Sequence, residues 1–144
     1  MRNAIAGLVL VMVLSSLSAP VLGQGHVSVE VFTTPHYRVT GIGRAQRALA
    51  VGEVQVYDLS AAMRLENSLS DGLPSDQAEA ASIAAHRIRN LDAKQLQQAF
   101  GGLVRASALR LDRIPAVVID GHAVVYGVTD VVEAYGHYRR WRGD

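Results

Sequence analysis

The stretch that decides the fold runs from Ile114 to Tyr126 and reads IPAVVIDGHAVVY. An apolar run follows the proline, Asp120-Gly121 interrupts it, and a second apolar run comes after. Asp-Gly between two apolar runs is a strong β-hairpin signal. Both runs are apolar at successive positions, which is typical of strands covered on both faces. We therefore predict paired strands at residues 116–119 and 122–126 in a sheet that is covered on both faces.

Upstream of the hairpin, the chain predicts a βαβ unit. Residues 27–32 read VSVEVF, which alternates β-branched and polar positions and indicates a strand. The composition of residues 42–51 is helical, and Gly52 is expected to end that helix. Residues 54–57 alternate again and predict a second strand. Short links between these three elements imply parallel strands joined by a right-handed crossover.

Three helices are expected between the βαβ unit and the hairpin. The first covers residues 60–69, and the second begins at Ser75 or Asp76 and ends near Asn90. Asp92 with Gln95 three residues later is a capping-box signature for the third. Its apolar residues recur at helical spacing on one face, at Leu96, Ala99, Phe100, Leu103 and Val104. Gly101-Gly102 interrupts that pattern and indicates a bend or a close approach.

A last helix follows the hairpin. Thr129 is the expected N-cap, with Asp130 and Glu133 in the first turn. The predicted buried stripe consists of Val128, Val131, Val132, Tyr135 and Tyr138. The basic cluster over residues 139–142 complements the negative end of the helix dipole. Contact with nucleic acid or anionic lipid is the alternative for this cluster, but three charges make a weak patch.

The first 23 residues have the pattern of a secretory signal peptide. Arg2 precedes an apolar run over residues 4–14, and small side chains lead to Gly23. A membrane anchor is the alternative, but a spanning helix needs about 20 apolar residues, and this run is shorter. We expect cleavage after Gly23, a single domain over residues 24–144, and a periplasmic location without a stable membrane anchor.

Composition excludes several classes of function. The 144 residues contain no cysteine, so disulfides, zinc–thiolate sites, cysteine nucleophiles and dithiol redox chemistry are ruled out. Without Arg2, the only charged residue of the leader, basic and acidic residues balance, which gives no electrostatic footprint for nucleic acid. The five histidines show no metal-ligand spacing, and no Gly-x-Ser-x-Gly elbow occurs. We expect no cofactor, no metal and no catalytic residue.

The order of these elements resembles the thioredoxin fold over essentially all of the chain after the leader. Residues 114–121 (IPAVVIDG) are similar to the strand that thioredoxin-like proteins begin with a cis-proline. Residues 29–35 (VEVFTTP) are similar to the first strand and loop of glutaredoxin-like members. In those enzymes a Cys-x-x-Cys motif follows, and its sulfur positions fall near Tyr37 and Thr40 here. The resemblance thus implies a thioredoxin-like α/β domain that lacks the redox chemistry.

A second resemblance is more specific to this chain. The leader, the VFTT segment, the cysteine-free loop, IPAVVIDG and VYGVTD together resemble a family of exported proteins encoded in bacterial integrating conjugative elements. The chain is also distantly similar to the TrbC-like conjugation proteins of F-type plasmids. This resemblance implies a role in type IV secretion-type DNA transfer, with other exported conjugation proteins as partners. It implies no established activity.

Two segments are the candidate partner-binding residues. His36, Tyr37, Arg38 and Thr40 are expected where the first strand passes into the first helix, and an anion or a peptide could bind there. The resemblance implies a cis Ile114–Pro115 bond whose preceding backbone pairs with extended peptides, a contact that needs no thiol. In the alternative interpretations, the loop is merely exposed and Pro115 only shapes the strand entry.

Three functional classes remain open on the sequence. The first is a non-catalytic interaction or assembly factor of conjugation. The second is a periplasmic enzyme or small-ligand binder that uses the loop around Tyr37. The third is a structural subunit held in place by its apolar and helical surfaces.

Overall fold

The computed structural model describes residues 26–49 and 51–143. The predicted leader, residues 1–23, and its cleavage point lie outside the described residues. Within the described ranges, no helix has both the length and the apolar character needed to cross a membrane.

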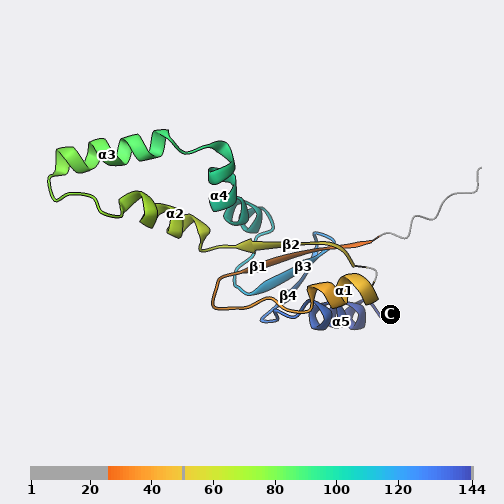
Figure 1. Ribbon diagram of the computed structural model, residues 1–144. Helices are drawn as coiled ribbons and strands as arrows, with labels where there is room; N and C mark the ends of the chain where they lie inside the picture. Colours follow the sequence, from red (N-terminus) through yellow and green to blue (C-terminus); the bar gives the residue numbers. More distant parts are fainter. Residues whose placement is uncertain (1–25, 50, 144) are drawn as a thin grey trace, which may run out of the picture.

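The described chain forms a four-stranded sheet with five helices (Figure 1). In chain order the elements are β1 (Val27–Thr33), α1 (Ile42–Ala48), β2 (Val51–Asp58), α2 (Ala61–Ser70), α3 (Gln77–Arg89), α4 (Ala93–Ala108), β3 (Ala116–Ile119), β4 (Ala123–Tyr126) and α5 (Val131–Arg142). The strand order is β2-β1-β3-β4, with β1 and β2 parallel and the other two pairs antiparallel. This arrangement confirms the predicted thioredoxin-like α/β fold.

The hairpin forms where the sequence predicts it. Asp120 has φ 50° and Gly121 has φ 71°, and the His122 N–H donates to the Ile119 carbonyl at 3.2 Å. Two successive positive φ angles give the backbone twist that favours a tight hairpin. All four residues of β3 are fully buried, as their continuous apolar run predicts. The returning strand β4 begins at Ala123, one residue later than expected.

Two predicted boundaries are wrong. Helix α1 ends at Ala48, and residues 51–52 belong to β2 instead of to the helix. Gly52 marks a close approach rather than a helix end, because a Cβ there would lie 2.9 Å from the Cβ of His26. At α5 the N-cap is Asp130 and not Thr129, since the Asp130 carboxylate accepts the first free N–H groups of the helix.

The sheet has a core on each face. Helices α1 and α5 cover one face, where the main buried side chains are Val29, Val31, Val117, Ile119 and Val131. Phe32, Ala116 and Val118 face the other side and pack against Ala106 of α4. Three of the five residues in the predicted α5 stripe, Val128, Val132 and Tyr135, are only partly buried against the first core.

Helices α2, α3 and the start of α4 project beyond the sheet as an arm (Figure 1). Helix α3 has no buried residue, and α4 buries only Ala99, Gly102 and Ala106. Of the five residues on the predicted apolar face of α4, only Ala99 is buried, and Val104 is 68% exposed. The capping box formed by Asp92 and Gln95 is present as predicted. The arm therefore exposes an apolar helix face to solvent.

An ion pair fixes the end of α4 to the sheet. Arg105 donates from Nε and Nη2 to the two carboxylate oxygens of Glu30 on β1, each at 2.7 Å. The Glu30 side chain is 15% exposed. A two-pronged contact of this kind sets both the position and the rotation of α4 over the sheet.

Candidate functional site

The loop after β1 folds back on the end of its own strand. The buried Thr33 side chain donates from Oγ1 to the Tyr37 carbonyl at 2.7 Å, and the Tyr37 N–H donates to the Thr34 carbonyl at 2.9 Å. These two bonds leave the side chains of His36, Tyr37 and Arg38 exposed at the turn. Tyr37 is 45% exposed.

The Ile114–Pro115 bond lies beside this loop and is cis, as the resemblance implies. Phe32 pairs with Ala116, so the antiparallel register places Pro115 next to Thr33. Pro115 is buried, and its carbonyl accepts the Gly127 N–H at 2.9 Å. The Ile114 backbone N–H and carbonyl have no hydrogen-bond partner among the described residues. The backbone just before β3 therefore offers one unpaired N–H and one unpaired carbonyl.

Thr40 is bonded to the start of α5. Its N–H donates to the Thr129 carbonyl and its carbonyl accepts the Val131 N–H, both at 3.0 Å. Its hydroxyl donates to the Asp130 carboxylate at 2.9 Å, and Arg44 contacts the same carboxylate oxygen at 2.8 Å. Each polar group of Thr40 thus connects the loop to the start of α5, and this residue has a structural role.

The Asp130 carboxylate is the centre of that connection. Burial alone would raise the pKa of Asp130, but several contacts outweigh it and lower the pKa. The largest of these are the hydrogen bond from the Glu133 N–H and the bond from the Thr40 hydroxyl. The Val132 N–H and the positive charge of Arg44 act in the same direction. The ionised carboxylate is the form that the fold stabilises.

A hollow of about 370 Å³ separates the loop from the end of β2. Its walls are the loop residues 33–35 and 37–39 together with Val56 and Asp58 of β2. We use the term loop surface for the hollow, the exposed Tyr37 and Arg38 side chains, and the free N–H and carbonyl of Ile114.

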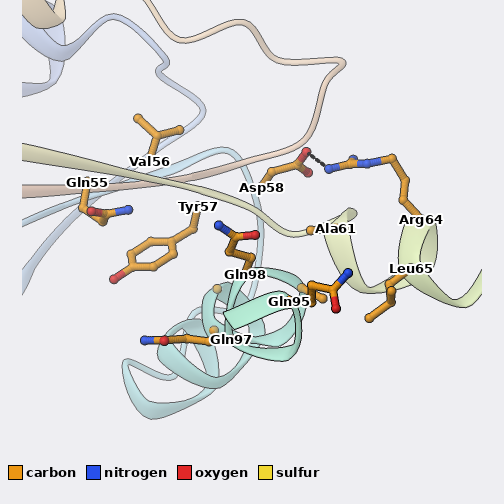
Figure 2. Close-up of a pocket in the computed structure, with 13 residues that line it drawn as sticks. Gln55, Val56, Tyr57, Asp58, Ala61, Arg64, Leu65, Gln95, Gln97 and Gln98 are labelled. Carbon is orange, nitrogen blue, oxygen red and sulfur yellow. Dashed lines mark ion pairs between the residues drawn. The ribbon is translucent and has the colours of Figure 1, made fainter. Parts of the chain in front are cut away.

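A larger cavity of about 780 Å³ lies between β2, α2 and α4 (Figure 2). Its polar lining includes four glutamines, Gln55 from β2 and Gln95, Gln97 and Gln98 from α4. Figure 2 also shows the ion pair that joins Asp58 at the end of β2 to Arg64 on α2, with a distance of 2.8 Å. No sequence pattern indicates this cavity, because its walls come from three elements that only the fold brings together.

Two titratable groups that line this cavity, Asp58 and Tyr57, have shifted pKa values. Burial alone would raise the pKa of Asp58, but hydrogen bonds from Ser60 and Arg64 outweigh it and lower the pKa. Burial raises the pKa of Tyr57, and the neighbouring Glu30 carboxylate raises it further. Asp58 is thus held ionised by its partners and Tyr57 is held neutral.

The glutamine side chains of the cavity can bind a ligand through hydrogen bonds. Amide side chains both donate and accept, so the cavity lining matches peptide groups or other uncharged polar groups. Over residues 26–49 and 51–143, no group of three or more histidines and carboxylates could hold a metal ion.

The comparisons with known proteins give one match. No curated protein and no solved structure matches the chain significantly. Residues 27–144, which include all nine elements of the fold, match a family described as a protein of unknown function, DUF1525. This chain therefore belongs to the DUF1525 family.

Proposed function

We propose that this chain is a non-catalytic, exported interaction or assembly factor of an integrating conjugative element. It binds extended segments of other exported proteins during type IV secretion-type DNA transfer. The proposal combines the resemblance of the sequence to conjugation proteins, including TrbC-like ones, with the geometry of the loop surface. Export through cleavage of residues 1–23 and a periplasmic location are parts of the same proposal.

The observation that carries the proposal is the unpaired backbone N–H and carbonyl of Ile114. A free N–H and carbonyl at the end of a strand can pair with an incoming extended backbone, which supplies affinity without any special side chain. Tyr37 and Arg38 belong to the loop that begins at Thr33, the neighbour of Pro115 in the strand register, and they can provide contacts to the side chains of the bound segment. Aromatic and arginine side chains are the ones that most often dominate binding energy at protein interfaces.

The residues that replace the redox motif also support a binding role. Tyr37 and Thr40 occupy the two positions where the resemblance places sulfur, and the chain contains no cysteine. Thiol–disulfide exchange requires a thiolate, so this chemistry is not available to the protein. What remains of a thioredoxin-like site is its peptide-pairing backbone.

A charge reversal at the loop surface tests the proposal. Arg38→Glu should lower conjugation frequency in a mating assay, because it removes a contact at the rim of the docking surface. Arg47→Glu is the matched control, since Arg47 is also an exposed arginine but belongs to α1. Immunoblots must show equal amounts of both proteins. Equal transfer by the two variants at equal protein level would argue against a docking role for the loop surface.

Photo-crosslinking identifies what binds there. A photoreactive phenylalanine at Tyr37 should form an adduct with another exported protein in mating cells, whereas the same group at Arg47 should not. The hollow beside Tyr37 favours a small-ligand binder as the second candidate function. That candidate predicts loss of transfer in Arg38→Glu without any protein adduct at Tyr37.

A further inference from the structure

The strand β4 is an unprotected edge of the sheet. Among the described strands it pairs only with β3. The Gly127 N–H donates a hydrogen bond to the Pro115 carbonyl. In an antiparallel pair, hydrogen-bonded residues alternate along the strand with residues whose N–H and carbonyl groups point away from the partner. Val125 therefore bonds to β3, while the N–H and carbonyl groups of Val124 and Tyr126 face outward.

The sequence of this edge also favours pairing. The four residues of β4 read AVVY, without charge or proline, whereas the opposite edge strand β2 carries Glu53 and Asp58. Charged side chains and prolines are two of the devices that prevent an edge strand from pairing with another chain. Of the two edges, β4 is therefore the one that can accept a further strand.

An apolar groove runs beside this edge. It has a volume of about 580 Å³ and lies between β4 and the outer side of α5, where Tyr138 and Trp141 line it. Trp141 is 71% exposed, which makes it the most exposed large apolar side chain in the described part of the chain. Glu133, His137 and Arg140 form the adjoining polar stripe of α5, with contacts of 3.7 Å and 3.1 Å along it. This stripe is acidic near its start and basic near its end.

We propose that a second copy of this chain pairs with β4 through a two-fold axis at Val125. In this register Val124 of each copy exchanges two backbone hydrogen bonds with Tyr126 of the other, so four bonds form. Val125 then faces its own counterpart in a position without hydrogen bonds. The two four-stranded sheets become one continuous sheet.

The helices support a second copy as the occupant, rather than an unrelated peptide. Helix α5 packs over β3 and β4, and neighbouring strands are about 4.8 Å apart. The two α5 helices would then lie about 10 Å apart, close to the usual distance between packed helices. The two-fold axis makes them antiparallel, which brings Glu133 of each copy towards Arg140 of the other. Each Trp141 side chain then lies against the groove of the second copy.

The first test is the oligomeric state of the protein purified from cells that express the full chain. Sedimentation equilibrium should show a monomer–dimer equilibrium. Val124→Pro should raise the dimer dissociation constant at least about tenfold, because two intermolecular bonds are lost. Proline is tolerated at an edge where the N–H faces away from the sheet. A protein that stays monomeric at every concentration would overturn the proposal.

Val56→Pro on β2 is the matched control. The Leu59 N–H donates to the Thr33 carbonyl of β1, so every second residue of β2 before Leu59 also bonds to β1. Val56 lies between two of these residues, and its N–H therefore points away from β1, along the outer edge of β2. This variant should leave the dimer dissociation constant unchanged. An equal effect of both proline variants would show that pairing does not use β4.

A second test of the dimer exchanges the charges of Glu133 and Arg140, and it applies even if a proline variant does not fold. Glu133→Arg alone brings two arginines together across the interface, and Arg140→Glu alone brings two glutamates together, so each variant should dimerise more weakly. A mixture of the two variants pairs opposite charges again and should recover dimers. Loss of folding cannot be reversed by mixing, so recovery identifies the interface. Equal dimerisation of wild type and both single variants would refute the antiparallel α5 arrangement.

Discussion

The adjacent glycines of α4 allow a sharp test of how the arm is attached to the sheet. A Cβ at Gly102 would lie 3.1 Å from both the Tyr57 Cβ and the Leu59 Cδ2. A Cβ at Gly101 would meet only Gln97 Cγ, at 4.0 Å. Both positions lie within the same helix, so both alanine variants gain the same intrinsic helix propensity of about 1 kcal/mol. Any difference between them therefore reports the contact with β2.

The two variants should differ in stability, with Gly101→Ala the more stable. Gly101→Ala should raise the free energy of unfolding by about 0.5–1 kcal/mol, because the methyl group enters open space. At Gly102 the Leu59 side chain can rotate away, but the Tyr57 Cβ is fixed by its strand. Overpacking of this kind costs roughly 1–3 kcal/mol, which cancels or exceeds the propensity gain. Gly102→Ala should thus be less stable than Gly101→Ala by that amount.

Thermal unfolding followed by circular dichroism measures this difference. For a domain of this size, 1 kcal/mol corresponds to roughly 4 °C in Tm, so Gly102→Ala should melt about 4–12 °C below Gly101→Ala. Urea unfolding provides an independent measure of the same free energies. Equal stabilisation of both variants would mean that α4 does not lie against Tyr57 and Leu59, and the cavity lined by β2 and α4 would have to be reconsidered.

Two further predictions concern the charged contacts that join distant segments. Asp130→Asn should lower the free energy of unfolding at neutral pH by about 1 kcal/mol, since the ionised carboxylate joins Thr40, Arg44 and the start of α5. The folded-state pKa of Asp130 is lowered, so this stabilisation is present above the unfolded-state pKa and is lost as the pH falls through the folded value. Urea titrations of both proteins at several pH values should show their difference shrinking on acidification, and a constant difference would contradict the assignment. Arg105→Leu leaves Glu30 nearly buried without its partner, so Glu30→Leu/Arg105→Leu should be more stable than Arg105→Leu alone; the reverse order in urea unfolding would contradict this reasoning.

The sequence was most informative where short-range chemistry determines the structure. The hairpin follows from Asp120-Gly121 between two apolar runs, and the start of α4 follows from the reciprocal bonds of Asp92 and Gln95. The prediction that Gly52 ends α1 is wrong because a glycine can end a helix and can also permit a close approach of two chain segments. Only the packing of His26 against β2 distinguishes these two causes, and no local pattern contains that information.

The helical arm and the sites could not be predicted in the same way. The spacing of Leu96, Phe100 and Leu103 is that of a buried helix face, yet burial depends on whether the sheet extends beneath it. It does not extend that far, because β2 is the edge strand and α4 crosses it only near Gly102. The resemblance implied the cis Ile114–Pro115 bond, which the structure has, and it placed the candidate binding residues Tyr37 and Thr40 in the loop after the first strand. A motif spacing does not show the bond from the Thr40 hydroxyl to Asp130, ninety residues later.

The two proposed contacts use different parts of the fold and can coexist. The loop surface lies at the ends of β1 and β2 and at the backbone just before β3, whereas the proposed dimer pairs the free outer edge of β4. A dimer would therefore present two loop surfaces at a fixed separation, and a partner with repeated segments would bind with avidity beyond that of one site. The tests separate these effects, because Val124→Pro should change sedimentation without removing the Tyr37 adduct. Arg38→Glu should reduce transfer without changing sedimentation, so either contact can fail while the other stands.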